Sequence, residues 1–157
     1  DLLVISDDGT IIRMDCGSIS IYGRATQGVR IMRVAEGCRV MVCQADVADK
    51  DAVDAMVRRI EETFGPVSLL VNNAGIAGQE LFQDVTPQMW HRYFAVNVDG
   101  AYHTTQAVLP HMLHEHSGCI ITVSSMWGQV GSSCEAAYSA SKGAVIALTK
   151  ALAKELA

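Results

Sequence analysis

The sequence predicts an α/β fold in which an antiparallel β segment precedes a parallel sheet with crossover helices. Residues 1–41 alternate apolar and polar side chains between turn-forming residues, which is typical of antiparallel strands joined by tight turns. From Asp49 onward the apolar side chains recur with the period of amphipathic helices. Short unbroken apolar runs separate these helices, as in parallel strands that are buried on both faces.

The composition indicates one globular domain of ordinary size. The 157 residues are half apolar and 18% charged, and the net charge is −5, which does not favour binding to nucleic acid or to an anionic membrane. There is no apolar run of membrane-spanning length and no signal segment. Because the first residue is Asp rather than Met, we expect a processed product or a fragment.

The five cysteines are odd in number and show no CxxC spacing. They predict reduced thiols and a cytoplasmic location. The histidines of "HMLHEH" (111–116) leave two interpretations open, a metal site or a solvated helix end. The second is favoured because no cysteine or carboxylate framework accompanies them, so we expect no metal.

The first segment contains two alternating runs, "DLLVIS" and "TIIRMD", on either side of Asp8-Gly9. An Asp-Gly pair between such runs predicts a β-hairpin. Further alternating runs, "SISIY" and "GVRIMRV", follow. Residues 1–41 hold five arginines, five acidic residues and no lysine.

The first predicted helix runs from Asp49, its N-cap, to Gly65, where Pro66 prevents continuation. One face carries an apolar stripe: Val53, Met56, Val57, Ile60 and Phe64. A second helix begins with a Thr86 cap and extends to about His116, with a bend near Asp99-Gly100.

The last predicted helix covers 136–157. Strands are predicted near 40–45, 67–72 and 119–124, and helices of sufficient length join them, so we expect them to be parallel. One face of this sheet should be partly bare, unless the strands of residues 1–41 cover it or extend the sheet edge.

Tyr138 and Lys142 stand four positions apart on the last helix and so share a face. A free tyrosine has a pKa near 10, so a tyrosine that transfers protons near neutral pH needs a neighbouring positive charge. Ser125 lies thirteen positions upstream, at the carboxyl end of a strand, where parallel sheets bind ligands. The alternatives are a surface tyrosine with a lysine neighbour, and Ser124 in place of Ser125.

Four motifs in order, "VNNAG" (71–75), "NVDG" (97–100), "IITVSS" (120–125) and "YSASK" (138–142), resemble the short-chain dehydrogenase/reductase family. The resemblance is to its 3-oxoacyl carrier-protein reductase-like members and covers about residues 42–157. It implies a partial Rossmann-like domain. It also implies NAD- or NADP-linked carbonyl reduction or alcohol oxidation of a small molecule, with the choice of cofactor left open.

The same resemblance implies roles for four catalytic residues. Tyr138 would be the acid/base, and Lys142 would promote its ionisation and bind the nicotinamide ribose. Ser125 would position the substrate oxygen, and Asn97 would hold a water in a proton relay.

The cofactor site implied by the resemblance includes five further residues: Asp46 and Val47 beside the adenine, and the turn Asn73, Ala74 and Gly75. Two of them have plainer alternatives, since Asn73 can tie strands together and Asp46 can be a loop or capping residue. The self-associating surfaces would be the helices near 86–116 and 136–157.

The family's glycine-rich turn, which brings backbone N–H groups to the cofactor pyrophosphate, is not found. The nearest candidate, "GRATQGVR" (23–30), has glycines five apart and is favoured as a turn between strands. Residues 1–41 instead resemble one blade of the C-terminal β-pinwheel of the DNA gyrase A subunit. "AEGCRVMVCQADV" (35–47) would then join two domains, 1–41 and 42–157, in an apparent chimera.

We therefore expect an oxidoreductase whose isolated chain binds its cofactor weakly and has little or no activity. The alternatives are a DNA-binding fragment of a type II topoisomerase and an inactive recombined chain. DNA binding is disfavoured because residues 1–41 have no net formal charge.

Overall fold

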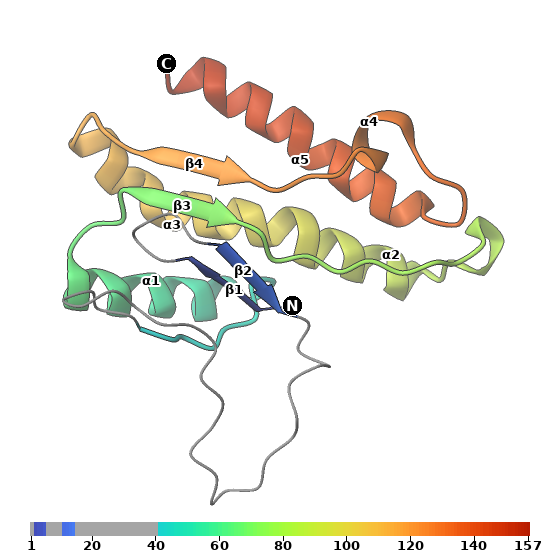
Figure 1. The fold of residues 1–157 in the computed structure, drawn as a ribbon, viewed down its shortest axis with the longest axis horizontal. Helices are drawn as coiled ribbons and strands as arrows, with labels where there is room; N and C mark the ends of the chain where they lie inside the picture. Colours follow the sequence, from blue (N-terminus) through green and yellow to red (C-terminus); the bar gives the residue numbers. More distant parts are fainter. Residues whose placement is uncertain (1, 6–10, 15–40) are drawn as a thin grey trace, which may run out of the picture. The chain divides into compact units, whose positions relative to one another are not determined.

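The computed structural model describes residues 2–5, 11–14 and 41–157 (Figure 1). The chain divides into two compact units, Asp1–Val42 and Cys43–Ala157. The catalytic candidates all fall in the second unit.

The described part of the first unit is an antiparallel strand pair. β1 (Leu2–Ile5) pairs with β2 (Ile11–Met14), with Leu2 opposite Met14 and Ile5 opposite Ile11. This confirms the antiparallel pairing expected for the first two alternating runs. The Asp8-Gly9 turn, the runs at 18–22 and 28–34, and the candidate turn at 23–30 lie outside the described residues.

The second unit contains the predicted parallel strands in shortened form. β3 (Leu69–Asn72) pairs in parallel with β4 (Cys119–Thr122), and Asn72 lies opposite Thr122. The prediction of a strand near 40–45 is wrong for the described residues 41–45, because they do not form a strand. A strand exists through hydrogen bonds to a neighbour, and within the described part of the chain β3 and β4 pair only with each other.

The helices follow the predicted order. α1 (Lys50–Phe64) starts at Asp49, whose side chain accepts from the N–H groups of Asp51 and Ala52, and it stops at Gly65, which has a φ of 88°. After a short 3₁₀ turn, η2 (Phe82–Asp84), α2 (Pro87–Phe94) begins at the expected Thr86 cap.

The long helix predicted to bend near Asp99-Gly100 is interrupted there by a π-helical turn. This turn, η3 (Ala95–Asp99), joins α2 to α3 (Gly100–His114). Pi-helical turns inside α-helices are frequent at functional sites, and this one carries Asn97. The chain then forms α4 (Trp127–Val130), which the sequence did not predict, and α5 (Ala136–Glu155).

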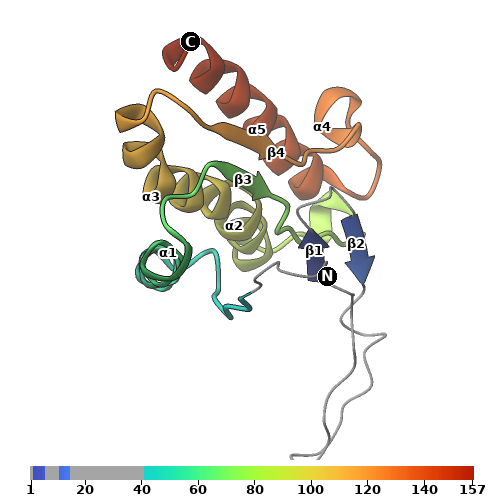
Figure 2. The same ribbon diagram turned by 60° about the vertical axis from the view of Figure 1, so that its left-hand side comes forward.

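One face of the β3–β4 pair is covered by packed helices (Figure 2). The core holds Val53 and Val57 of α1 against Val108 and Met112 of α3, with Leu70 and Ile120 of the two strands packed on them. These four valine and methionine side chains are nearly inaccessible to solvent. The central residues of the apolar stripe predicted on α1 therefore face the core. Phe64, at the end of the stripe, is 43% exposed.

On the other face of the strand pair, apolar side chains are about half exposed. Leu69 and Ile121 are 50% and 47% exposed. No helix in the described part of the chain is long and apolar enough to cross a membrane. Within the same residues, no three His, Cys, Asp or Glu side chains gather where they could hold a metal ion.

Candidate active site

The candidate site lies at the carboxyl edge of the strand pair. Because β3 and β4 are parallel and in register, the segments after Asn72 and Thr122 leave the sheet side by side. The Val123 N–H donates to the Asn72 carbonyl at 2.9 Å and extends this pairing by one residue. The Asn72 side chain accepts from the Thr104 hydroxyl at 2.6 Å and donates to that of Thr105 at 3.0 Å, which fastens the edge to α3.

Asn97 lies at the centre of the site and is only 3% exposed. Its Oδ1 accepts from the Ile76 N–H at 2.8 Å, and its Nδ2 donates to the Ile76 carbonyl at 3.0 Å. Nδ2 also donates to the Ser141 hydroxyl at 2.9 Å. Asn97 therefore joins three elements: the loop after β3, the π-helical turn that carries it, and α5.

Lys142 and Tyr138 share one face of α5, as the sequence predicted. The Lys142 Nζ lies 5.8 Å from the centre of the Tyr138 ring and donates to the Val123 carbonyl at 2.9 Å. Lys142 is only 5% exposed, and burial lowers the pKa of its ammonium group below 10.5. Tyr138 itself is half-buried, so this buried cation lies beside its ring.

Ser125 lies on the loop between β4 and α4. Its Oγ accepts from the Trp127 N–H at 3.2 Å, and its carbonyl accepts from the Gly128 N–H at 3.0 Å. The neighbouring Ser124 is turned the other way, toward α5, and donates its hydroxyl to the Lys142 carbonyl at 2.9 Å. The Ser124 hydroxyl is thus engaged with the main chain of α5, and this leaves Ser125 as the better candidate for a substrate contact.

Of the turn Asn73, Ala74 and Gly75, the glycine lies close to the side chains of Asn97 and Lys142. A Cβ atom on Gly75 would lie 3.2 Å from Asn97 Oδ1 and 3.4 Å from Lys142 Nζ. Ala74 and Gly75 are both exposed, while Asn73 is half-buried. The turn therefore offers an open main-chain surface directly over the buried ammonium group of Lys142.

Asp46 and Val47 lie apart from these residues, against the junction of α2 and α3. Asp46 Oδ1 accepts from the Ala48 N–H at 3.0 Å, and its Oδ2 lies 3.3 Å from Arg92 Nη1. The Ala48 N–H and, less strongly, Arg92 lower the pKa of this carboxyl group, although some desolvation opposes them. The Val47 carbonyl lies 3.0 Å from His103 Nδ1.

A second polar cluster joins the loops that flank the site. The Glu80 N–H donates to the Cys134 carbonyl at 2.8 Å, and the Tyr93 hydroxyl donates to Glu80 Oε2 at 3.1 Å. Burial and the Glu80 carboxylate raise the pKa of Tyr93. These contacts hold the segment before α5 against the loop after β3.

Two positions with contacts in the site, Ser141 and Gly128, were missed by sequence reasoning, whereas Ser124 was considered only as an alternative to Ser125. Ser141 is fully buried, and its hydroxyl donates to the Tyr138 carbonyl at 2.7 Å while accepting from Asn97. Its place beside Lys142 in "YSASK" was the available signal, but a serine within a helix more often bonds to its own backbone.

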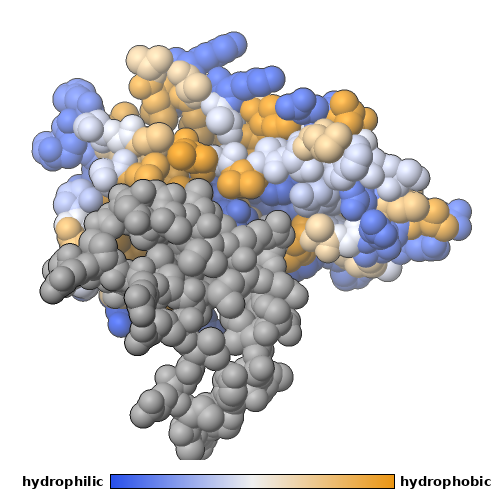
Figure 3. Space-filling model, viewed as in Figure 1, coloured by the Kyte–Doolittle hydropathy of each residue, from blue (hydrophilic) through white to orange (hydrophobic). Residues whose placement is uncertain are grey.

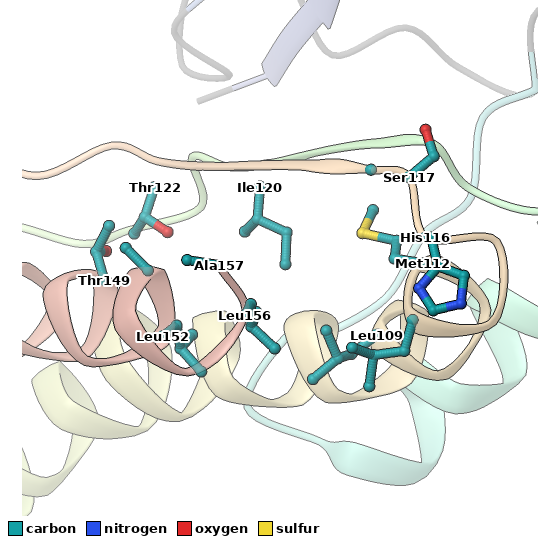
Figure 4. A pocket seen from close by; sticks show the side chains of 13 residues that line it. Leu109, Met112, His116, Ser117, Ile120, Thr122, Thr149, Leu152, Leu156 and Ala157 are labelled. Atoms are coloured by element: carbon teal, nitrogen blue, oxygen red, sulfur yellow. The ribbon is translucent and has the colours of Figure 1, made fainter.

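A cavity lies away from the candidate site. It has a volume of about 530 Å³ and lies between α3, β4 and the end of α5 (Figure 4). Its walls are mainly apolar and include Leu109, Met112, Ile120, Leu152 and Leu156. None of the candidate catalytic or cofactor residues lines it, so it is not part of the candidate active site.

The site brings together a tyrosine and a lysine on one helix, a serine after the adjoining strand and a buried asparagine. The family model described as "short chain dehydrogenase" matches residues 18–157. The chain belongs to the short-chain dehydrogenase family.

Individual relatives support the same family. A 3-oxoacyl-[acyl-carrier-protein] reductase FabG of Staphylococcus aureus is 42% identical over 123 residues, which cover 78% of this chain and 50% of the relative. Nodulation protein G of Azospirillum brasilense is 37% identical over 98% of this chain and 61% of its own length. The 5-keto-D-gluconate 5-reductase of Escherichia coli is 38% identical over 78% of this chain and 48% of its own. The chain thus spans about half the length of these curated relatives.

The matches reach further toward the start of the chain than the sequence motifs did. The family model begins at residue 18, and the alignment with nodulation protein G covers nearly the whole chain, so both enter the segment that resembles a gyrase blade. The gyrase resemblance and the domain boundary near residue 41 gain no support from these comparisons and stay hypotheses.

Proposed function

We propose that this chain is an NAD(P)-dependent oxidoreductase that reduces a carbonyl group or oxidises an alcohol on a small molecule. Tyr138 acts as the general acid/base, and Lys142 favours the ionised form of its phenol. Ser125 binds the substrate oxygen, and Asn97 holds a water molecule in the proton relay. The relatives that support this reaction class include two named reductases.

The observation that carries the proposal is the burial of the Lys142 ammonium beside Tyr138. An isolated buried charge is costly, and burial here lowers the lysine pKa. The Lys142 ammonium donates one hydrogen bond to the Val123 carbonyl. An ammonium group has three N–H donors, so Lys142 keeps donors for a ligand hydroxyl. A surface tyrosine with a lysine neighbour would not need this environment.

The residues around Lys142 fit a nicotinamide cofactor. Gly75 brings its backbone close to Lys142 and Asn97, where a Cβ atom would be in tight contact with both side chains, and the turn it belongs to is open to solvent. Lys142 and Tyr138 would hold the cofactor's ribose, and Asn73, Ala74 and Gly75 would lie along it, with Asp46 and Val47 near the adenine. When bound, the cofactor supplies or accepts the hydride.

The test is carbonyl reduction at millimolar cofactor. The chain is incubated with NADH or NADPH and a panel of small ketones and 3-oxo esters, and the loss of reduced cofactor is followed by absorbance. We expect slow reduction in the parent and at least about a hundredfold loss in Tyr138→Phe, because general acid–base catalysis contributes on the order of 10²–10⁴. Tyr102→Phe, an exposed tyrosine on α3, is the control. Measurable reduction by the parent at a rate that Tyr138→Phe leaves unchanged would contradict the proposal.

Cofactor binding by the 157-residue chain should be weak. The sequence holds no turn with the spacing G-x-x-x-G-x-G, and that turn supplies N–H donors to the pyrophosphate. Losing two or three charge-assisted hydrogen bonds weakens binding by about three to six powers of ten. At cellular cofactor concentrations we therefore propose little or no activity for the isolated chain. Micromolar binding of NAD(P)H in a fluorescence titration would show that another segment forms the phosphate site.

The DNA-binding alternative concerns residues 1–41. Their formal charge is zero, whereas DNA binding depends largely on neutralising phosphates. We therefore expect no retardation of a labelled duplex at moderate salt. A shift that weakens steeply as salt rises would favour the gyrase-like interpretation instead.

A further inference from the structure

We infer that Gly128 is a positioning residue that sets Ser125 against the Lys142–Gly143 turn of α5. The inference rests on the proposed function, because it concerns the placement of the same catalytic side chains. Gly128 itself has no side chain with which to act on a substrate. Its contribution is the space that its missing side chain leaves.

The evidence is a close approach of two backbones. A Cβ atom on Gly128 would lie 2.6 Å from the Lys142 carbonyl carbon and 2.8 Å from both the Lys142 oxygen and the Gly143 nitrogen. These are main-chain atoms within α5, so they cannot move aside as a flexible side chain would. On the facing helix, a Cβ on Gly143 would lie 3.2 Å from the Gly128 oxygen. Only glycine at 128 permits this close approach of the two backbones. Figures 1 and 2 show α4 beside α5.

The same glycine holds Ser125 on its other side. The Gly128 N–H donates to the Ser125 carbonyl at 3.0 Å, and the preceding Trp127 N–H donates to the Ser125 hydroxyl at 3.2 Å. Ser125 is therefore separated from Lys142 by a single residue that touches both. The distance between them is set by contact rather than by a flexible loop.

Two further contacts fix the same turn. The Ser124 hydroxyl donates to the Lys142 carbonyl at 2.9 Å, and the Lys142 ammonium donates to the Val123 carbonyl at 2.9 Å. Residues 123–128 thus contact Lys142 in three ways. Val123 binds its ammonium group, Ser124 binds its carbonyl, and Gly128 packs against its main chain. Since Tyr138 lies one turn earlier on α5, this arrangement places Ser125 relative to the tyrosine as well.

The experiment compares four variants with the parent: Gly128→Ala, Ser124→Ala, Ser124→Thr and Gln129→Ala. Gln129 follows Gly128 on α4 and is exposed, so its variant is the matched control. Ser124→Thr keeps the hydroxyl and is the conservative rescue. A Trp90→Phe background leaves Trp127, which is bonded to Ser125, as the single tryptophan.

The main readout is acetylation of Lys142 by an N-hydroxysuccinimide ester, quantified residue by residue by mass spectrometry. The chain has four lysines, and exposed Lys150 and Lys154 on the same helix serve as internal references. We expect Gly128→Ala to raise Lys142 labelling at least about tenfold relative to Lys150, because local opening exposes it. Ser124→Ala should raise it roughly two- to tenfold, the effect of one hydrogen bond.

Two further measurements, fluorescence of Trp127 and the rate of ketone reduction, report on the placement of Ser125. Gly128→Ala should increase quenching of Trp127 fluorescence by acrylamide, and Ser124→Thr and Gln129→Ala should behave as the parent. Where the parent reduces a ketone at millimolar NADPH, Gly128→Ala should lower kcat at least about tenfold while the KM for NADPH stays within about twofold.

Parent-like labelling of Lys142 in a folded Gly128→Ala would overturn the inference. If Gly128→Ala does not fold, the test is the comparison of Ser124→Ala with Ser124→Thr. Equal labelling of Lys142 in Ser124→Ala and the parent would then overturn the inference. An active Gly128→Ala with parental kcat would do the same. By contrast, the proposed function fails when Tyr138→Phe has no effect on turnover, whatever the labelling shows, so the two failures are distinguishable.

Discussion

Asn97 is the residue on which most of the buried hydrogen bonding of the site converges. Its side chain forms hydrogen bonds with the N–H and the carbonyl of Ile76 and with the hydroxyl of Ser141. The Ser141 hydroxyl in turn donates to the Tyr138 carbonyl. An asparagine can do this because its side chain presents an acceptor and two donors in one plane. Asn97 would also hold the relay water under the proposed function, so its role is structural as well as chemical.

Asn97→Ala should destabilise the chain by roughly 1–3 kcal/mol, because the partly buried groups of Ile76 and Ser141 lose their partner. Urea unfolding followed by far-ultraviolet circular dichroism measures this. Gln79→Ala, an exposed position in the loop after β3, is the control and should change the free energy of unfolding by less than about 0.5 kcal/mol. Equal stability of the two variants would contradict the bonding described for Asn97.

Lys142 gives a prediction about pH, because burial lowers its pKa in the folded state below 10.5. Between the lowered pKa and 10.5 the unfolded chain binds more protons than the folded one, so stability rises with pH through this window. The destabilising effect of the charge is fully present below the lowered pKa. The parent should therefore gain stability relative to Lys142→Met as pH rises toward 10.5.

Urea unfolding of the two proteins at several pH values measures this trend. The matched control is Lys150→Met, which removes an exposed charge from the same helix. A constant difference between the parent and Lys142→Met across the window would show that the ammonium is not held at a desolvation cost.

At the scale of elements, the junction between α2 and α3 depends on Gly100. A Cβ atom there would lie 2.6 Å from Val47 Cγ2 and 3.0 Å from Val47 Cβ. Val47 is stiff because it is β-branched, and its carbonyl is held near His103, so it cannot turn away freely. The close approach lets the segment before α1 lie on the start of α3.

Gly100→Ala should therefore destabilise the chain, although alanine is the better helix former by about 1 kcal/mol. Overpacking costs roughly 1–3 kcal/mol and is expected to exceed that gain. In a Val47→Ala background the clash is relieved, so Gly100→Ala should become neutral or stabilising. A double-mutant cycle of unfolding free energies checks this, and additive effects of the two substitutions would contradict it.

At the scale of the whole molecule, the surface of the second unit carries apolar side chains that a partner could cover. Figure 3 shows hydrophobic residues among polar ones on the visible face. Tyr102 and Leu113 of α3 are about half exposed, and the apolar cavity of Figure 4 opens between α3 and α5. Val145 of α5 packs in the interior and does not contribute to this surface.

We predict that the chain self-associates through the helices near 86–116 and 136–157, because exposed apolar patches favour association. Light scattering coupled to size-exclusion chromatography should show a mass above that of one chain, rising with concentration. Leu113→Glu should lower this mass without loss of helicity. A monomer at high concentration would contradict the prediction.

Much of the site was predictable where it depends on short sequence separations. Tyr138 and Lys142 share a face because four positions make about one helical turn, whatever surrounds them. The cap at Asp49 and the stop at Gly65 are equally local. The strand predicted near 40–45 was wrong over its described residues because a strand depends on a neighbour that no local pattern specifies.

The sequence by itself determined the family, the order of helices and parallel strands, and the identity of the proton-transfer candidates. Each of these follows from spacing along one element or from motifs in order. Only the tertiary structure decided that Asn97 bonds to Ser141, forty-four positions away, and that Gly128 rests on Lys142 and Gly143. These contacts join residues distant in the chain. They depend on how the elements pack, which local periodicity does not encode.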